Sequence, residues 1–422
     1  SFQLSMIRLL ALLASAFTLV SCRSGQKVLL ISFDGFRHDC LNDTFVPNIH
    51  RWAQNSSWFT NGVMSQRITM TAPNHLSIIT GLTEKDHGIV GNFFYDEEKR
   101  EVFDPYNGTG KAGVVEDSET AKWFRGDPIW SVNQRQGGQS AVFYWPVGDF
   151  ETANVQGVDA RPWREMGNLE KWKRDVDDIL NLMDNGTNFV AWYIAEPDST
   201  LHKRGFYYDG AFAKVMSTLD EVFGYLQEQL DVRARRSDTN VILTADHGHI
   251  QIEKGQIMCV NHVVPGVLGV DYQVGEYTVF PRNESFALEA YESLKDVIRR
   301  RGLKINVHWR EDIPEEWNFL YPNRIGRIYI EPRAGAHVVM KCKYYSVNDS
   351  ASSAHGHDAA LPDMHALLVM DGPAFRKSQQ IEEIPQNIDL YPLMGKILGL
   401  EMPPNAGKLE TISRALASED KL

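Results

Sequence analysis

The sequence predicts an α/β protein with a doubly wound, mostly parallel central sheet, helices on both faces and a small insertion of loops and strands. Three nearly continuous apolar runs support this prediction, namely KVLLISF at 27–33, NFVAWYI at 188–194 and NVILTA at 240–245. Strands that are covered on both faces have this pattern, because neither face has to alternate with polar residues. Two weaker runs of the same kind lie at 140–145 and 365–370.

Amphipathic helical patterns separate the apolar runs. Residues 169–183 and 210–230 repeat apolar side chains at steps of three and four, which places these side chains on one helical face. The alternation of strand and helix is typical of doubly wound sheets. Residues 255–340 are richer in loops and short strands, and we expect an insertion subdomain there. We expect one main domain over 25–402, followed by a C-terminal tail over 403–422.

The composition argues against a nucleic-acid-binding protein. The chain of 422 residues has a formal net charge of -12, whereas phosphate backbones are bound by Lys and Arg. At the start of the chain, Met6 and Arg8 precede the apolar stretch LLALLASAF, and small residues follow up to Cys22. This order predicts a secretory signal peptide over residues 1–22. The letters LVSC also resemble a bacterial lipoprotein cleavage site with Cys22 lipidated.

The sequons favour an extracellular protein of a eukaryote. Six Asn-x-Ser/Thr sequons occur, at Asn42, Asn55, Asn107, Asn185, Asn283 and Asn348. Their number predicts N-glycans on a secreted or cell-surface protein. Cys259 and Cys342 could form a disulfide and leave Cys40 free, but the spacing does not decide this pairing. No apolar stretch of about 18 residues follows the signal peptide, so we expect no further membrane-spanning segment in this sequence.

Each of the three strong runs leads into a carboxylate. Asp34 follows the run at 27–33, Asp198 comes shortly after 188–194, and Asp246 follows 240–245. Ligands bind at the carboxyl ends of the strands in open α/β sheets. Three acidic residues at equivalent positions therefore predict one shared site.

Histidines accompany these carboxylates. His202 lies four residues after Asp198, on the same face if a helix begins there, and His247 directly follows Asp246. The segment SAHGHDAALPDM supplies two more histidines. Mixed Asp and His ligands suit zinc or a similar divalent metal. This set is too large for one tetrahedral zinc, and it matches two ions about 3.5–4 Å apart, as in many phosphate-cleaving enzymes.

The segment TMTAPNHLSIITG, residues 69–81, adds a hydroxyl. Thr71 precedes Ala72, Pro73 and an apolar run that ends at Gly81, which predicts a helix of about two turns with Thr71 as its N-cap. Next to two divalent cations, a threonine hydroxyl can lose its proton near neutral pH and become a nucleophile. A helix N-terminus would stabilise both the alkoxide and an incoming phosphate.

Together these residues resemble the nucleotide pyrophosphatase/phosphodiesterase family of the alkaline-phosphatase superfamily, in its short, single-domain form. The resemblance runs from about Lys27 to about Leu400 and includes SFDGFR, TAPNH, DHGIVGN, DPIW, EPDST-x-H, TADHG, HGHDAALPDMHAL and GPAF. It implies an extracellular hydrolase with two Zn²⁺ ions. Its substrate would be a small phosphodiester or pyrophosphate such as a dinucleotide, ATP, ADP or NAD, with no nucleic-acid polymer as partner.

The resemblance also implies a role for each matched position. The ligands of one zinc would be Asp34, Thr71, Asp246 and His247. The ligands of the other would be Asp198, His202 and His355. His355 is preferred to His357 because it is the histidine of the family's HG-x-D pattern, and His75 would pack near the site. Thr71 would attack phosphorus in line and form a phosphothreonine that water then hydrolyses, with Asn92 donating its amide to a non-bridging phosphate oxygen.

Two positions depart from the pattern of the nucleotide-cleaving members. These members usually have an aromatic residue after the nucleophile and often Lys before it, whereas this chain has Ala72 and Met70. A small residue at this place is more similar to the branch that cleaves phosphocholine lipids. Asn74, in PNH, is more similar to the nucleotide branch. A nucleotide enzyme is our leading interpretation, with a choline-lipid phosphodiesterase of the sphingomyelinase or glycerophosphocholine type as the alternative.

Three aromatic residues are candidates for the substrate pocket. Tyr95, Tyr144 and Trp145 could stack on a base or enclose a quaternary ammonium group by cation–π attraction, and ordinary core packing explains them equally well. A monoester phosphatase of the same superfamily, or a catalytically silent ectodomain that binds a partner, are further alternatives.

Overall fold

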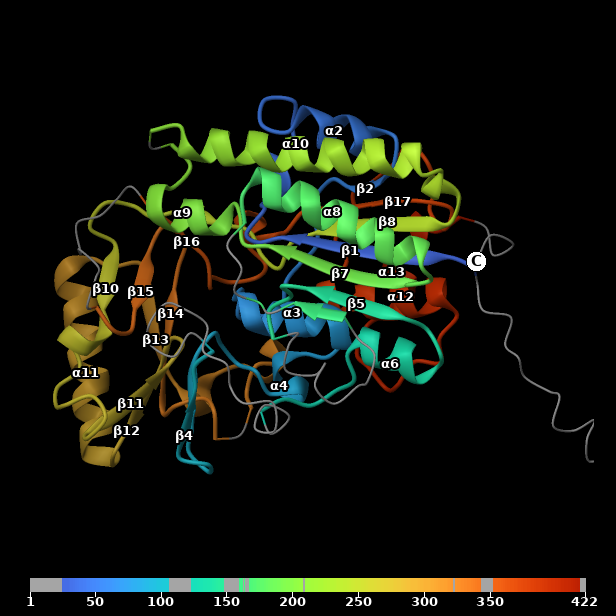
Figure 1. The fold of residues 1–422 in the computed structure, drawn as a ribbon. Helices are drawn as coiled ribbons and strands as arrows, with labels where there is room; N and C mark the ends of the chain where they lie inside the picture. Colours follow the sequence, from blue (N-terminus) through green and yellow to red (C-terminus); the bar gives the residue numbers. More distant parts are fainter. Residues whose placement is uncertain are drawn as a thin grey trace, which may run out of the picture.

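The computed structural model describes residues 25–105, 123–147, 159–161, 163, 167–207, 209–321, 323–342 and 352–417. The predicted signal peptide over 1–22 lies outside these ranges. At the centre is an eight-stranded sheet with the strand order β18-β2-β17-β8-β1-β7-β5-β6 (Figure 1). In that order the strands are β18 (Gln379–Ile381), β2 (Ser57–Phe59), β17 (Leu368–Asp371), β8 (Thr239–Thr244), β1 (Lys27–Phe33), β7 (Phe189–Ile194), β5 (Ser140–Phe143) and β6 (Asp159–Arg161).

The three strong apolar runs form the middle of this sheet. β1 pairs in parallel with β7 on one side and with β8 on the other, and β5 continues the parallel order from β7 to β6. β1 is buried over almost its whole length, as the absence of alternation predicted. The mostly parallel, doubly wound α/β sheet is therefore confirmed.

The run at 365–370 differs from the prediction. The strand here, β17, begins only at Leu368 and runs antiparallel to β8. The preceding residues are engaged elsewhere, because the backbone N–H of Ala366 donates to Val63 and that of Leu367 donates to Phe36.

Helices cover both faces of the sheet (Figure 1). One face is covered by α2 (Pro47–Gln54), α8 (Leu169–Asp184) and α10 (Ala211–Val232). On the other lie α3 (Thr71–Thr80), α4 (Glu84–His87), α6 (Ile129–Arg135), α12 (Leu390–Leu398) and α13 (Leu409–Ile412). The two predicted amphipathic helices correspond to α8 and α10, whose apolar faces are buried.

The segment 255–340 contains a second, antiparallel sheet at one end of the central one (Figure 1). Its strand order is β11 (Tyr272–Gly275), β12 (Thr278–Pro281), β14 (Ile328–Pro332) and β13 (Ile305–Trp309). It also contains the long helix α11 (Glu284–Arg301) and the parallel pair β10 (Ile257–Cys259) and β15 (His337–Val339). A disulfide joins Cys259 to Cys342 with a Cα–Cα distance of 5.9 Å, and Cys40 is a buried free thiol.

The remaining strands and the remaining α-helix are short. They are β3 (Phe94–Asp96), β4 (Glu101–Phe103), α9 (Asp198–Arg204), β9 (Ile250–Gln251) and β16 (Ser353–Ala354).

The part of the expected tail that the structure describes, 403–417, packs against the main domain. Ile412 and Ala415 are buried, and the carbonyl of Ala415 accepts hydrogen bonds from the Ser57 hydroxyl and the Arg376 backbone N–H. Among the described residues, the helices lack the combination of length and apolar character that crossing a bilayer requires.

Candidate active site

The three predicted carboxylates meet at one edge of the central sheet. Because β1, β7 and β8 are parallel neighbours, their carboxyl ends lie side by side. At this edge Asp34 directly follows β1, and Asp246 follows β8 after one residue, Ala245. Asp198 is the first residue of α9, and its backbone N–H donates to the carbonyl of Asp34. The placement that the strand ends predicted is therefore present.

Gly35 permits this close approach. Its φ of +69° is left-handed, and its N–H donates to Asp246 Oδ1 at 3.1 Å. A Cβ at this position would lie 2.8 Å from His249 Cδ2 and 3.0 Å from Asp198 Cβ. The glycine of SFDGFR is thus required by the backbone conformation and by the space that the site leaves.

One group of possible metal ligands contains Asp34, Asp246 and His247. His247 Nε2 lies 3.0 Å from Asp246 Oδ2 and 3.7 Å from Asp34 Oδ1. The hydroxyl of Thr71 lies 3.5 Å from the same nitrogen. All four side chains are buried. The structure therefore gathers the residues that the resemblance assigned to the first zinc.

A second group contains Asp198, His247, His249 and His355, with ligand atoms within 4.8 Å of one another. His202 adjoins this group, because its Nε2 lies 3.2 Å from Asp198 Oδ1 and 3.0 Å from His355 Nε2. The helix that begins at Asp198 brings these two side chains to one face, as the spacing of four residues predicted. The residues assigned to the second zinc are thus also together.

Backbone carbonyls fix the orientation of two of these imidazoles. The Nδ1 atom of His247 lies 3.0 Å from the carbonyl of Gly248, and that of His355 lies 2.7 Å from the carbonyl of Thr69. A carbonyl can only accept, so each Nδ1 carries a hydrogen, and each Nε2 is the nitrogen that faces the carboxylates. Histidine ligands of metals have this arrangement, in which the other ring nitrogen is hydrogen-bonded.

The electrostatics of the cluster fit a cation. Burial and the negative charges of Asp246 and Asp198 raise the pKa of Asp34 well above its usual range. Among the described residues, Asp34 Oδ1 and Asp246 Oδ2 are buried without a hydrogen-bond donor. Burial, together with the neighbouring His247, lowers the pKa of His355 well below its usual range, so this imidazole is neutral. Buried carboxylates with free oxygen atoms beside a neutral imidazole fit the donor set that divalent metals bind.

Thr71 corrects one detail of the prediction. The N-cap of α3 is Met70, and Thr71 is the first helical residue of a helix of 10 residues, longer than the two turns expected. Its hydroxyl faces His247 Nε2 instead of capping the backbone. Gly81 ends the helix in the left-handed conformation, as expected. Asn92 lies next to this helix start, where its Oδ1 accepts a hydrogen bond from the Ala72 N–H at 2.8 Å.

Sequence reasoning missed two side chains of the site. The Tyr193 hydroxyl donates to Asp34 Oδ2 at 2.5 Å. Tyr193 belongs to the apolar run of β7, so the sequence pattern gave no indication of a polar role. His249, two residues after His247, is completely buried, with its Nε2 2.7 Å from Asp198 Oδ1. The letters DHGH contain the only signal for His249, and they do not show which way the second imidazole turns.

Other predicted candidates have structural contacts instead. His357 is buried and its Nε2 donates to the carbonyl of Ala336, outside both ligand groups. His75 packs beside the site, as expected, with its Nδ1 bonded to the Thr71 carbonyl. Tyr144 and Trp145 are buried, and they donate hydrogen bonds to Asp175 and to the carbonyl of His75, respectively.

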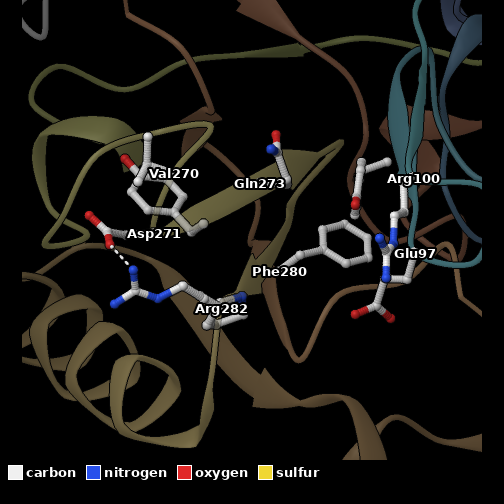
Figure 2. A pocket seen from close by; sticks show the side chains of 10 residues that line it. Glu97, Arg100, Val270, Asp271, Gln273, Phe280 and Arg282 are labelled. Carbon is white, nitrogen blue, oxygen red and sulfur yellow. Dashed lines mark ion pairs between the residues drawn. The ribbon is translucent and has the colours of Figure 1, made fainter.

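Tyr95 lies in a separate hollow of about 500 Å³ between the β3–β4 and β11–β12 hairpins (Figure 2). Its ring stands edge-on to Phe280 at 5.4 Å between centroids, and Arg282 forms an ion pair with Asp271 nearby. Ten residues line this hollow, and the predicted metal ligands are not among them. Among the described residues, this hollow and the two ligand groups therefore share no side chain.

Comparison with known proteins assigns this fold and cluster to a class of hydrolase. Residues 28–358 match the family model described as type I phosphodiesterase / nucleotide pyrophosphatase. A bis(5'-adenosyl)-triphosphatase of Xenopus laevis is 30% identical over 399 residues, which cover 94% of this chain and 83% of that protein. Ectonucleotide pyrophosphatase/phosphodiesterase family member 5 of Homo sapiens is 30% identical, covering 93% of this chain and 78% of its own length.

Solved structures agree with the sequence comparison. The murine family member 5 superposes with a TM-score of 0.79 at 28% identity, covering 93% of this chain and all of that chain (100%). An inactive variant of the murine protein, in complex with AMP, superposes equally well with a TM-score of 0.79 at 27% identity. The fold is alkaline-phosphatase-like, and the class is that of phosphodiester and pyrophosphate hydrolases. The chain belongs to the nucleotide pyrophosphatase/phosphodiesterase family.

Proposed function

We propose that this protein is an extracellular enzyme that hydrolyses nucleotide phosphodiester or pyrophosphate bonds, with two zinc ions and with Thr71 as the nucleophile. The observation that carries the proposal is the meeting of two ligand groups, which share His247, beside the Thr71 hydroxyl. Both groups are needed for this chemistry, because one cation would stabilise the attacking oxygen and the other the leaving oxygen.

The chain offers a ligand set for each ion. For the first we propose Asp34, Asp246 and His247 together with Thr71. For the second we propose Asp198, His202 and His355. When bound, the ions would lower the pKa of the Thr71 hydroxyl and neutralise the charge on the phosphate.

The chain's own groups then act on the substrate. Thr71 Oγ1 forms a bond to phosphorus while the bond to the leaving oxygen breaks, and water later cleaves the phosphothreonine and restores the hydroxyl. The N-terminus of α3, where Thr71 is the first residue, presents its dipole to the phosphate. Because Asn92 Oδ1 accepts from the Ala72 N–H, its amide NH₂ is the group left to donate to a phosphate oxygen.

The substrate class is proposed from the relatives. The similar proteins named above include a bis(5'-adenosyl)-triphosphatase and a structure in complex with AMP. We therefore propose nucleotides such as dinucleotides, ATP, ADP or NAD as substrates. The comparisons do not favour the choline-lipid alternative, which depended on the small residue at Ala72.

A direct assay tests this proposal. Purified protein loaded with zinc should release nitrophenol from nitrophenyl-TMP, and EDTA should abolish the release. The matched control substrate is nitrophenyl phosphate, a monoester that we expect to react more slowly. Parallel measurement of AMP and phosphocholine release from diesters separates the nucleotide enzyme from the lipid enzyme. An unreactive zinc-loaded protein, or full activity in EDTA, would end the proposal.

The extracellular location rests on separate features. Asn55, Asn185 and Asn283 are exposed, as glycan acceptors must be, and Cys259 forms its disulfide with Cys342. Asn107 and Asn348 lie outside the described residues. Expression in eukaryotic cells should yield secreted protein whose mass falls on enzymatic removal of N-glycans. Retention inside the cell without glycans would contradict this part of the proposal.

A further inference from the structure

His249 is the imidazole in the site to which the resemblance gives no role. It lies between Gly248 and β9, and its side chain is completely buried. Its ring is 5.0 Å from that of His202 and 5.1 Å from that of His355, measured between centroids. His249 Nε2 and Asp198 Oδ1 are 2.7 Å apart. The nitrogen therefore lies among the atoms proposed to bind the second ion.

The far side of the ring indicates which nitrogen carries the hydrogen. His249 Nδ1 is 3.1 Å from Ser353 Oγ, and this hydroxyl is 3.1 Å from the carbonyl of Leu201. Because a carbonyl only accepts, the Ser353 hydrogen points to Leu201, and Ser353 Oγ accepts from His249 Nδ1–H. In the neutral ring of His249, Nε2 then carries a lone pair that faces the carboxylate oxygen of Asp198. Two acceptors 2.7 Å apart repel each other unless a proton or a metal ion lies between them.

The distances around Asp198 Oδ1 match those of a coordination shell. Nε2 atoms surround it at 2.7 Å for His249, 3.2 Å for His202 and 3.5 Å for His355. In tetrahedral zinc with bonds of about 2.0–2.1 Å, the ligand atoms lie about 3.3 Å apart. A small adjustment of these side chains therefore admits an ion within reach of all four atoms.

We propose that His249 Nε2 is a protein ligand of the ion at Asp198, which gives this ion three imidazoles and one carboxylate. The inference rests on the proposed metal centre and adds a ligand to it. Four protein ligands would fill a tetrahedral shell, so binding of a substrate oxygen requires expansion to five-coordination. A nitrogen-rich shell also favours zinc and cobalt over magnesium.

A crystal structure of the zinc-loaded protein, with anomalous scattering to locate the metal, is the direct test. We expect His249 Nε2 within about 2.0–2.1 Å of the ion at Asp198. An ion held by Asp198, His202 and His355 alone, with His249 hydrogen-bonded to Asp198 outside the shell, would overturn the inference and leave the proposed function standing. Absence of any ion at Asp198 would refute both.

A variant gives a second readout that does not use activity. Glutamine would preserve a hydrogen bond from this position to Asp198 but is a poorer metal ligand than histidine, so His249→Gln separates ligation from hydrogen bonding. We expect His249→Gln to weaken one of the two zinc sites by at least about tenfold in chelator competition. The matched control is His357→Gln, because His357 is also buried but lies outside both groups. Wild-type affinity at both sites in His249→Gln would contradict ligation, and if this variant does not fold the crystal structure decides.

Discussion

The proposed role of Thr71 can be tested by comparing two substitutions at this one position. Thr71→Ala and Thr71→Ser remove the same methyl group, and only Thr71→Ala also removes the hydroxyl. The difference between the two variants therefore isolates the oxygen that we propose as the nucleophile. We expect Thr71→Ala to lose turnover and Thr71→Ser to retain a measurable part of it.

The structure separates the expected loss of activity from a loss of stability. The side chain is 4% exposed, so the shared methyl contributes about 1 kcal/mol to the free energy of unfolding. The hydroxyl forms no cap bond, and its distance of 3.5 Å from His247 Nε2 is long for a hydrogen bond. Its removal should cost less than about 1 kcal/mol of stability. Loss of a nucleophile should lower kcat by at least about 10³-fold, equivalent to about 4 kcal/mol in the activation barrier.

The assay is hydrolysis of nitrophenyl-TMP, with zinc content and thermal unfolding measured on the same preparations. Thr71→Ala should keep the fold and most of the zinc while it loses turnover. Activity of Thr71→Ala within tenfold of the wild type would refute the assignment. A zinc-loaded, folded Thr71→Ser variant that is as inactive as Thr71→Ala would refute the reasoning that a hydroxyl suffices.

Three further outcomes follow from the same structure. Asp246→Asn should lower the zinc content measured by elemental analysis while the protein stays folded, because the amide oxygen can still accept from the backbone but the charge is lost. Replacement of Cys259 and Cys342 by Ser should lower the free energy of unfolding by up to roughly 4.5 kcal/mol, since the disulfide closes a loop with a sequence separation of 83 residues; unchanged denaturant midpoints would contradict this. Burial raises the pKa of Glu331, but hydrogen bonds led by that from His308 outweigh burial and lower the pKa to about 2. The pKa of Glu331 in the folded protein is thus below the unfolded value of about 4.3. The ionised carboxylate therefore stabilises the fold above about pH 4.3, and this stabilisation is lost as the pH falls towards 2. Glu331→Gln should therefore unfold more easily than the wild type at pH 7 and equally near pH 2, and a pH-independent difference in denaturant titrations would contradict the assignment.

The apolar runs predicted much of the site because they determined where the strands end. Once β1, β7 and β8 were identified as buried parallel strands, their carboxyl ends had to share an edge, and the carboxylates that follow them had to meet. His202 was predicted for a related reason, since a helix starting at Asp198 places it one turn away. These inferences needed only the local period of the chain and the topology of the sheet.

The missed residues depend on contacts between segments that are distant in sequence. Tyr193 belongs to an apolar strand, and only the pairing of β7 with β1 brings its hydroxyl to Asp34. His249 is positioned by Ser353, 104 residues away, and by Asp198. No periodicity in the sequence encodes such pairs.

Asn74 has a positioning role that the family motif did not reveal. Its placement in PNH favoured the nucleotide branch, yet the side chain is buried and makes backbone contacts before the nucleophile. Asn74 Oδ1 accepts from the N–H of Gln66, and Nδ2 donates to the carbonyls of Ile68 and Met70. A further hydrogen bond comes from the Asn387 amide. Asn74 therefore fixes the loop that precedes Thr71. This role is needed for any phosphodiester substrate. The presence of Asn at this position is thus informative about how the nucleophile is positioned and not about the leaving group.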